Sequence, residues 1–509
     1  MNCEDKNPEK QLILKEHQNN HVKRILKILE TKPGFIDASP TGSGKTFTTL
    51  YIAKKLNLKV FVICPPIVQS NWRDNCILHG VEYVEILSYQ GLRSIKNHQP
   101  SHEYLTRDDN SKKEPVFRTE LKFDELIDKG ILLILDEAQN LKNNCDQYRA
   151  CKQLCKKIQQ VNVDFREKIN INPLNFKVSK FCLLSGSLFD KKKHVLQFLE
   201  LSGLLPSIGD RKKLAFNDFV SFFQYCMSID KNNTKKFFEN SNKDLSIEEI
   251  ILTVYELFVN IVRPLICSSM PPPKELFIKT MKSGFFNMIT TDGNKLANEV
   301  NNLCKSLGYN DELDEIQNKS GLGGVVTALK NIETIKKPIF IENAKRILES
   351  NKKAKVIICL NYRDNIFDVA DSLKKYNPGV LIGGISMMEK DKIKYLFQTD
   401  DKYRLIIMTT CLSVGINLHD TTGERPRTMF ISPLHNVSHI HQAAGRIIRC
   451  DTSSATTVCL VYGKAALKET SIINALCRKT EVLKELHVEQ VENGVIFPAD
   501  YAKFFEKDP

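Results

Sequence analysis

A short glycine-rich segment near the amino terminus has the residue types of a loop that holds phosphate groups. The segment is Ser39-Pro40-Thr41-Gly42-Ser43-Gly44-Lys45-Thr46, and it lies between an apolar run and a helical pattern. Glycines let backbone N–H groups close around phosphate oxygens, and the amino terminus of the following helix adds partial positive charge. Lys45 would pair with the β- and γ-phosphates of a nucleotide, and the Thr46 hydroxyl would ligate Mg²⁺. A chance turn rich in glycine and serine is the alternative, which the strand–loop–helix context disfavours. Ser39 stands where the leading glycine of such loops is usual.

Two adjacent acidic residues supply the second half of such a site. Asp136 and Glu137 directly follow the apolar run 131–135. A carboxylate at the carboxyl end of a neighbouring parallel strand can ligate Mg²⁺, and a second one can orient and deprotonate the attacking water. A surface turn is the alternative for these residues taken alone. With the phosphate loop they predict a nucleoside triphosphatase that uses Mg²⁺, but kinases, transporters and motors share this chemistry.

Apolar runs of strand length alternate with helical patterns around these residues. Runs with little internal alternation are typical of parallel strands covered on both faces. Residues 46–56 form a helix pattern, and the polar stretch 96–120 is predicted to be an inserted loop. The predicted strands are 34–39, 60–64, 84–88, 131–135 and 181–185, followed later by 356–360, 380–382, 405–409, 428–431 and 457–462.

The alternation stops between the two groups of strands, which predicts a domain organisation. The intervening residues show helix and loop patterns and include the run Pro271–Pro273, which favours a linker over a segment that binds a partner. We therefore expect an α/β fold with two parallel-sheet domains and a mainly helical insertion. The predicted boundaries are 1–205 for domain 1, 206–337 for the insertion and linker, 338–465 for domain 2 and 466–509 for a helical tail.

The composition excludes several classes of protein. The 509 residues are 42% hydrophobic and 26% charged, which argues against intrinsic disorder. No apolar run approaches the ~18 residues that span a bilayer, and the amino terminus lacks the apolar core of a signal peptide, so we expect no membrane partner. The formal net charge of +13 fits a polyanionic partner. The 15 cysteines form no CxxC pair, which disfavours a zinc ribbon and favours a reducing compartment.

The order of further sequence blocks resembles superfamily 2 helicases and translocases. Gln18 stands where these proteins carry a glutamine that contacts adenine. The segment 62–72 looks like their strand–proline–helix block, in which Pro65 would contact the nucleic-acid backbone and Trp72 is typical of the SWI/SNF-like branch. Ser185-Gly186-Ser187 matches the element through which Ser185 and Ser187 would couple hydrolysis to motion.

The carboxyl-terminal half completes this resemblance. Residues 409–418 look like the block that senses nucleotide and contacts phosphate, through Thr409 and Gly415. The segment 442–449 is a full QxxGRxxR match, which implies that Gln442, Arg446 and Arg449 act on the γ-phosphate. Arginine suits this role because its planar fork stays charged and binds phosphate oxygens in two places. The resemblance thus implies two RecA-like domains that face each other across an ATP cleft.

The resemblance also implies a function and partners. It implies an ATP-dependent helicase or translocase that tracks the backbone of RNA or DNA, and Gln139, where many relatives have His or Asp, leaves the choice between RNA and DNA open. The blocks look most like viral helicases related to the poxvirus enzyme that releases nascent transcripts. This implies a monomer that acts in viral transcription with the viral RNA polymerase, in the host cytoplasm at viral factories and in the virion. An ATPase that remodels protein–nucleic-acid complexes without separating strands, and a nucleotide-gated binding protein with little turnover, are the alternatives.

Several other residues have two interpretations. Trp72 can stack on a base or pack beneath its helix, and packing is favoured. The lysine run Lys191–Lys193 can contact phosphate or simply be solvated. Metal binding by the cysteines Cys145, Cys151 and Cys155 is disfavoured because their spacing matches no common site. The spacing of His435, His439 and His441 could suit a metal, but these histidines are expected to lie on the loop and helix that carry Gln442, which is the favoured interpretation.

Overall fold

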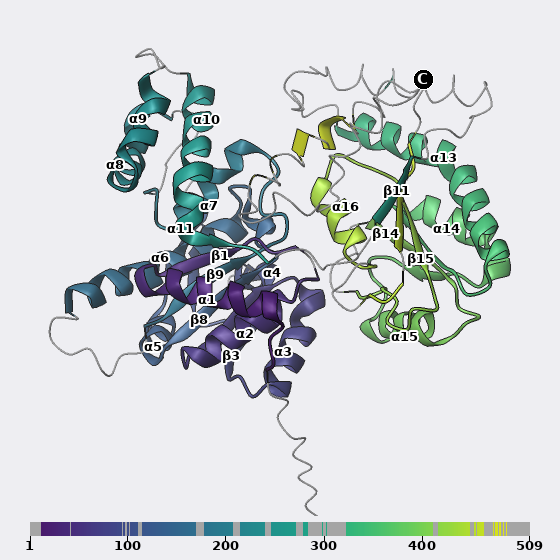
Figure 1. Cartoon of the computed structure of the whole chain (residues 1–509), viewed down its shortest axis with the longest axis horizontal. Helices are drawn as coiled ribbons and strands as arrows, with labels where there is room; N and C mark the ends of the chain where they lie inside the picture. Colours follow the sequence, from purple (N-terminus) through teal and green to yellow (C-terminus); the bar gives the residue numbers. More distant parts are fainter. Residues whose placement is uncertain are drawn as a thin grey trace, which may run out of the picture. The chain divides into compact units, whose positions relative to one another are not determined.

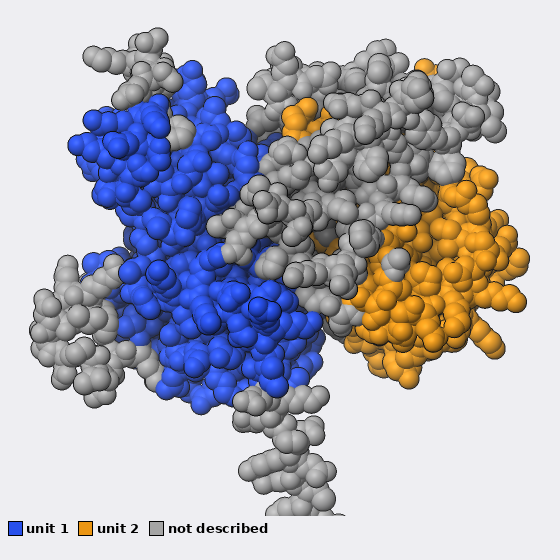
Figure 2. Space-filling model, viewed as in Figure 1, with its two compact units in different colours: residues 1–272, 482–493 blue, residues 273–481, 494–509 orange. Residues whose placement is uncertain are grey.

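The computed structural model divides the chain into two compact units. Unit 1 comprises residues 1–272 and 482–493, and unit 2 comprises residues 273–481 and 494–509 (Figure 2). The residues that the structure describes are 12–40, 42–93, 95–96, 99–100, 102–109, 114–168, 178–206, 214–239, 246–270, 278–282, 298, 302, 322–410, 416–447, 452–454, 456–462, 472, 474–476, 478–479, 482 and 485.

Unit 1 is built on a six-stranded parallel sheet with the order β10-β1-β9-β8-β2-β3. Its interior strands are buried along almost their whole length, as continuous apolar runs require when helices cover both faces (Figure 1). All five strands predicted for this part of the chain are confirmed to within two residues at either end. The strands are β1 (Gly34–Asp37), β2 (Lys59–Cys64), β3 (Tyr83–Ser88), β8 (Ile131–Asp136), β9 (Lys180–Leu184) and β10 (Cys267–Ser268).

The helices of unit 1 alternate with these strands or follow them along the chain, and most of them contribute side chains to the apolar core around the sheet, whereas α9 packs against α8 and α10. The predicted helix 46–56 is confirmed as α2, which begins at Lys45. The helices are α1 (Glu16–Thr31), α2 (Lys45–Lys55), α3 (Gln69–Leu78), α4 (Tyr89–Arg93), α5 (Leu121–Lys129), α6 (Asp146–Lys168), α7 (Val195–Leu201), α8 (Val220–Ile229), α9 (Lys231–Glu239), α10 (Ile247–Leu257) and α11 (Arg263–Ile266), with short helical turns at η1 (Pro66–Val68), η2 (Ala138–Leu141), η3 (Lys192–His194), η5 (Phe216–Phe219) and η6 (Phe258–Val262).

The segment predicted as a separate insertion, 206–337, is divided between the two units. Its first half contributes buried side chains such as Phe222, Val254 and Phe258 to the same apolar core as the sheet of unit 1. Strand β10 then joins the edge of that sheet, and β11 (Ile278–Lys282) joins the sheet of unit 2. The helical periodicity was visible in the sequence, but two-residue and five-residue edge strands are too short to be distinguished from loop by pattern alone.

The predicted boundary at Pro338 falls inside a helix. Helix α13 (Leu322–Ser350) continues through this proline, although proline removes one backbone donor and disfavours helix interiors. Tertiary contacts on both sides of it hold the helix: Glu333 accepts hydrogen bonds from the Asn361 side chain and backbone, and Phe340 is fully buried in the core of unit 2. Packing therefore overrides the local preference of the proline.

The stretch predicted as an inserted loop, 96–120, contains two small hairpins. The antiparallel pair β6 (Leu105–Asp108) and β7 (Val116–Thr119) buries Leu105 and Phe117 in the core of unit 1. The other pair is β4 (Ile95–Lys96) with β5 (Gln99–Pro100). The predicted loop is thus wrong for these residues, because one buried apolar side chain in each of β6 and β7 suffices when an existing core accepts it.

Unit 2 has a second six-stranded parallel sheet, with the order β11-β16-β15-β12-β14-β13. All five strands predicted here are confirmed within two residues. The elements are β12 (Lys355–Leu360), β13 (Gly379–Leu381), β14 (Leu405–Thr409), β15 (Arg427–Ile431) and β16 (Thr456–Leu460), with α14 (Arg363–Ser372), η8 (Lys374–Tyr376), α15 (Met387–Thr399) and α16 (Val437–Ala444). The prediction of two RecA-like parallel-sheet domains is confirmed.

Within the described residues, no helix is long and apolar enough to cross a membrane. Of the tail predicted at 466–509, Val482 packs against the core of unit 1, and Glu485 accepts a hydrogen bond from the Tyr255 hydroxyl.

One buried serine should report the stability of unit 1. The Ser179 hydroxyl donates to the Ile127 carbonyl at 2.7 Å and accepts from the Ile131 N–H at 2.8 Å, where β8 begins. Ser179→Ala leaves that buried N–H without this acceptor, so we expect a loss of about 1–3 kcal/mol in the free energy of unfolding. Urea unfolding followed by the fluorescence of Trp72, the single tryptophan of the chain, measures it. Ser228→Ala, at an exposed position, should stay within about 0.5 kcal/mol, and equal losses in the two variants would contradict the assignment.

Candidate functional site

The phosphate loop of unit 1 connects the carboxyl end of β1 to the amino terminus of α2. Gly42 and Gly44 have φ of 85° and 99°, a region that side chains with a Cβ rarely adopt, so both positions require glycine. The Ser43 hydroxyl donates to the Pro40 carbonyl at 2.7 Å and closes the turn. Thr41 lies outside the described residues. The backbone geometry is therefore that of a loop that can present N–H groups to an anion.

The ammonium group of Lys45 is held by this loop. It donates to the carbonyl of Ser39 at 2.9 Å and to that of Pro40 at 3.2 Å. Burial and the charge of Glu137 raise the pKa of Asp136, and the charge of Lys45 partly offsets this rise, so the lysine lies close enough to interact electrostatically with that carboxylate. The two halves of the predicted site are thus brought together in unit 1, with the half-buried Thr46 beside Lys45.

Gln18 lies directly against the phosphate loop. Its Nε2 donates to the Ser43 carbonyl at 3.2 Å, and its Oε1 accepts from the Lys15 N–H at 2.9 Å. The fit is close, because a Cβ on Gly44 would lie 2.4 Å from Nε2 of Gln18. The side chain is only 7% exposed, so α1 fixes the orientation of its amide at the loop.

Asp136 is a half-buried carboxylate with two donors. Its Oδ2 accepts from the indole Nε1 of Trp72 at 2.8 Å, and its Oδ1 accepts from the backbone N–H of Glu137 at 2.9 Å. Burial first, and then the neighbouring charge of Glu137, raise the pKa of Asp136 to about 6. Each carboxylate oxygen keeps a further lone pair, so the group can still ligate a hard cation.

The position of Trp72 decides between its two interpretations. Trp72 is 1% exposed, so its ring has no open face that could stack on a base of a nucleic acid. The favoured packing interpretation holds, with an added role: the indole N–H orients the carboxylate of Asp136. A buried indole N–H needs a partner, which links the tryptophan of one sequence block to the aspartate of another.

A continuous path of hydrogen bonds leads from Glu137 to the Ser-Gly-Ser element. Glu137 has φ of 54°, in the left-handed region, which turns its side chain away from the strand direction. Its Oε2 accepts from Nε2 of Gln139 at 2.7 Å, and Oε1 of Gln139 accepts from the Ser185 hydroxyl at 2.5 Å. The Ser185 hydroxyl in turn accepts from the N–H of Ser187 at 3.0 Å. Sequence reasoning placed all four residues in functional blocks but did not predict that Gln139 joins them.

In unit 2 the structure brings the two carboxyl-terminal blocks into contact. The N–H of Leu418 donates to the carbonyl of Arg446 at 2.8 Å. Thr409 ends β14, Gln442 lies on α16, and the side chains of Thr409, Gln442 and Arg446 are 5%, 5% and 4% exposed. Gly415 and Arg449 lie outside the described residues. Pro65, at the end of β2 in unit 1, precedes the turn η1 and the helix that carries Trp72.

Sequence reasoning missed two buried cations in unit 2, of which Arg427 contacts the carboxyl end of the first block. Arg427, 1% exposed, donates from Nε to the Leu418 carbonyl and from Nη2 to Oε1 of Gln398, both at 2.9 Å. Gln398 donates to the carbonyls of Asn417 at 3.3 Å and His419 at 3.1 Å. The backbone of residues 417–419 is therefore fixed by side chains from α15 and β15.

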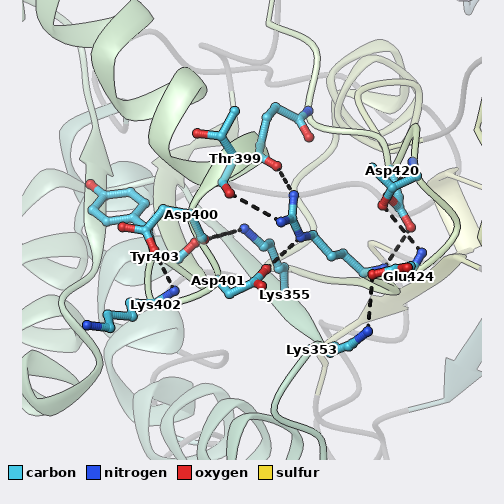
Figure 3. A network of polar contacts seen from close by, with 12 residues as sticks. Lys353, Lys355, Thr399, Asp400, Asp401, Lys402, Tyr403, Asp420 and Glu424 are labelled. Atoms are coloured by element: carbon cyan, nitrogen blue, oxygen red, sulfur yellow. Dashed lines mark hydrogen bonds and ion pairs between the residues drawn. The ribbon is translucent and has the colours of Figure 1, made fainter.

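Lys355 is the second cation and lies beside Arg427 in the sheet register. Its Nζ donates to the Asp400 carbonyl at 2.8 Å (Figure 3). It also donates to the carbonyls of Phe397 and Tyr403, at 2.5 and 3.3 Å. The Phe397 ring lies 5.2 Å from this Nζ and 5.0 Å from the Arg427 guanidinium carbon. Burial, followed by the positive charges of Arg427 and Arg425, lowers the pKa of Lys355 to about 8. A charged first residue in each of two buried apolar strands was the signal available in the sequence.

The alternative metal sites find no support in the part of the chain that the structure describes. There, no group of three or more His, Cys, Asp or Glu side chains is arranged to hold a metal ion, although the side chain of His441 is outside that part. Cys151 and Cys155 are buried free thiols in the core of unit 1. Lys192 forms an ion pair with Glu256 at 3.3 Å, so one lysine of the run 191–193 ties α10 to η3.

Two protein-family models match this chain in succession. The model of the type III restriction enzyme, res subunit, matches residues 11–164, which contain Gln18, the phosphate loop and the carboxylates. The model of the helicase conserved C-terminal domain matches residues 340–451, which contain the blocks of unit 2. The chain thus carries, in sequence order, the two modules of a superfamily 2 helicase.

Similarity to individual proteins is distant. The chain is 22% identical over 482 residues to the "Putative ATP-dependent RNA helicase L364" of Acanthamoeba polyphaga mimivirus, a match that covers 91% of this chain and 81% of the relative. Among solved structures, the Sulfolobus solfataricus SWI2/SNF2 ATPase core in complex with dsDNA has 17% sequence identity and a TM-score of 0.30, with 94% of this chain and 98% of that chain covered.

The first prediction from this geometry concerns Gln139. Gln139→Ala removes the link between Glu137 and Ser185 but leaves every phosphate-binding group in place, so kcat for ATP hydrolysis should fall on the order of tenfold while KM for ATP changes little. Tenfold corresponds to about 1.4 kcal/mol, close to the worth of a hydrogen bond to a charged group. Steady-state ATPase kinetics measure both constants. The matched control is Asn140→Ala, an exposed neighbour, which should keep wild-type kcat. A raised KM with unchanged kcat in Gln139→Ala would instead make Gln139 a binding residue.

The second prediction concerns Lys355 at alkaline pH. Because its folded pKa of about 8 lies below the ~10.4 of a lysine in an unfolded chain, the unfolded state binds more protons between these values. The stability of unit 2 should therefore rise with pH from about 8 toward 10, by at most ~1.4 kcal/mol per pH unit, relative to Lys355→Met. Alkylation of the buried Cys359 thiol during urea unfolding, located by mass spectrometry, reports unit 2. Lys353→Met removes an exposed lysine of the same segment and should keep the wild-type pH dependence; if it loses it equally, Lys355 is not the titrating group.

Proposed function

We propose that this chain, an ATP-dependent enzyme of helicase superfamily 2, uses ATP hydrolysis to move along one strand of a nucleic acid. The observation that carries the proposal is the hydrogen-bonded path from Glu137 through Gln139 to Ser185. An ATPase that only hydrolyses nucleotide needs no such connection from its water-activating carboxylate to a second sequence block. A motor needs one, because grip on the strand must change when the γ-phosphate is released.

The ATP site in this proposal is built from unit 1. Lys45 would leave the carbonyls of Ser39 and Pro40 for the stronger, charge-assisted contacts that phosphate oxygens offer. Gly42, Ser43 and Gly44 would supply backbone N–H groups, and Gln18 would contact adenine with the part of its amide that faces away from the loop. Glu137 would orient and deprotonate the attacking water.

The donor set of unit 1 fits Mg²⁺. The Thr46 hydroxyl and the Asp136 carboxylate are hard oxygen ligands, which this ion prefers, and it is usually held by one or two protein groups plus the nucleotide's phosphates. Trp72 would keep Asp136 oriented toward it. When bound, the ion would neutralise charge on the phosphates.

Unit 2 would supply the remaining groups. We assign Arg446 and Arg449 to the charge that develops on the transferred phosphoryl group, with Gln442 beside them, and Thr409 and Gly415 to sensing nucleotide and contacting phosphate. Pro65 of unit 1 would contact the strand backbone. The buried side chains of Gln442 and Arg446 imply that they act from a rigid frame.

The nucleic acid in this proposal is bound through its backbone. The net charge of +13 favours a polyanion, and the name of the mimivirus relative specifies RNA, which makes RNA the first substrate to test and DNA the second. The resemblance of the sequence blocks implies 3′-to-5′ movement by a monomer. It also implies a role in viral transcription, with the viral RNA polymerase as partner, in the cytoplasm of the host cell and in the virion.

The test is displacement of a strand or protein block placed far from the loading site. Displacement should require ATP and should stop at a gap in the tracked strand, because a backbone-gripping motor cannot cross it. RNA and DNA duplexes, each loaded from either end, give the substrate and the polarity. Glu137→Gln is the control: it should bind ATP but lose 10²–10⁴-fold in hydrolysis, the usual worth of a general base, and displace nothing.

Two outcomes would replace the proposal. Displacement of a protein block without separation of duplex strands favours an ATPase that remodels protein–nucleic-acid complexes. Displacement that ignores the gap and works only on short duplexes, whichever end is loaded, favours local melting without movement along the strand.

A further inference from the structure

Ser39, the residue that replaces the leading glycine of the phosphate loop, has a specific partner. It is fully buried, and its hydroxyl accepts a hydrogen bond from the backbone N–H of Met270 at 2.8 Å. Met270 lies just after β10, and both Met270 and Ser39 are buried. Glycine has no side-chain acceptor, so this bond exists only because the loop begins with serine.

A second set of bonds joins the same two segments beneath the loop. Asp37, fully buried at the end of β1, accepts from the Ser39 N–H at 2.9 Å through Oδ1 and contacts Nε2 of His21 at 3.0 Å through Oδ2. Nδ1 of His21 lies 2.8 Å from the hydroxyl of Ser268, on β10. The backbone adds two more bonds, from Ala38 N–H to the Ser268 carbonyl and from Ser185 N–H to the Asp37 carbonyl.

These side chains could be interpreted in two other ways. The order Ser268, His21, Asp37 is that of a hydrolytic nucleophile and its base, but Ser268 is fully buried and no substrate can reach its hydroxyl. The network could also be a satisfied polar core with no further role. However, burying these polar groups carries a desolvation cost that apolar side chains would avoid. The bonds also connect the end of β1 and the phosphate loop with β10 and the residue Met270 after it, directly from Met270 to Ser39 and from Ala38 to Ser268, and indirectly through His21 of α1.

The loop has a way to transmit nucleotide binding to this strand. Lys45 donates to the Ser39 carbonyl at 2.9 Å, and phosphate oxygens would compete for this ammonium. When the lysine leaves, the Ser39 peptide loses a partner on its loop side while its hydroxyl and N–H remain tied to Met270 and Asp37. A shift of Ser39 must therefore be shared with the segment that follows β10, from which the chain continues to unit 2.

We propose that Ser39, supported by the chain Ser268–His21–Asp37, is a positioning residue that transmits nucleotide binding from the phosphate loop to β10 and the chain segment leaving unit 1. The role requires nucleotide binding at the loop but not movement along a nucleic acid. Failure of the translocation proposal would therefore leave it intact, and the reverse also holds.

Hydrogen exchange on the full-length chain tests the proposal with a non-hydrolysable ATP analogue and Mg²⁺. In the wild type, the analogue should change the amide exchange rate of the peptide that contains Met270 several-fold. Ser39→Gly keeps a loop of the usual composition but removes the acceptor, so this peptide should no longer respond while the loop peptide still does. KM for ATP should rise about two- to tenfold, the range that one neutral hydrogen bond supports.

Ser268→Ala is the second variant, and it leaves every phosphate-contacting residue intact. It should reduce the response of the Met270 peptide and raise KM for ATP in the same direction. The matched control is Cys267→Ala, a buried neighbour whose side chain points to the opposite face of β10 and packs in the apolar core. It should lower the unfolding temperature but keep the wild-type response. A wild-type response in both Ser39→Gly and Ser268→Ala, or a loss in Cys267→Ala equal to theirs, would overturn the proposal and leave a purely structural network.

Discussion

The parallel register of three strands is the constraint on which the site of unit 1 depends. Leu184 of β9 lies opposite Asp37 of β1 on one side and opposite Asp136 of β8 on the other. Because all three strands run in the same direction, the phosphate loop, the carboxylates Asp136 and Glu137 and the Ser-Gly-Ser element all lie at the same edge of the sheet. A slip of one residue in either pairing would turn Asp136 or Ser185 to the opposite face and break the path through Gln139.

That register explains why residues far apart in the sequence form hydrogen bonds with one another at this edge of the sheet. Trp72 reaches Asp136 over a separation of 64 residues, and Gln139 reaches Ser185 over 46. Each pair consists of one residue just after a strand end and one from the turn or helix beside it. Buried donors and acceptors at a sheet edge have few possible partners, so the partners that exist fix the orientation of the candidate site residues.

In unit 2, buried cations hold the backbone near the candidate site residues in place. Its strands β12 and β15 begin with the cations Lys355 and Arg427, which stand opposite each other in register and are fully or nearly fully buried. Their bonds go to backbone carbonyls and to the amide of Gln398, so the loop after α15 and the backbone of 417–419 are held by donors that cannot rotate away. The cost of burying two like charges is visible in the lowered pKa values of both groups, to about 8 for Lys355 and about 10 for Arg427.

The sequence by itself determined five of the six strands in each sheet, the glycine-rich loop, the carboxylate pair and the order of the helicase-like blocks, because these depend on local periodicity and on residue types at fixed spacing. It could not determine that β10 and β11 are strands, that α13 runs through Pro338, or that Trp72 orients Asp136. Nor could it show that Ser39, an apparent departure at the head of the loop, is an acceptor for Met270. Each of these depends on a partner supplied by chain folded back from far away. Such partners are decided by sheet register and packing, and a single sequence carries neither in any local pattern.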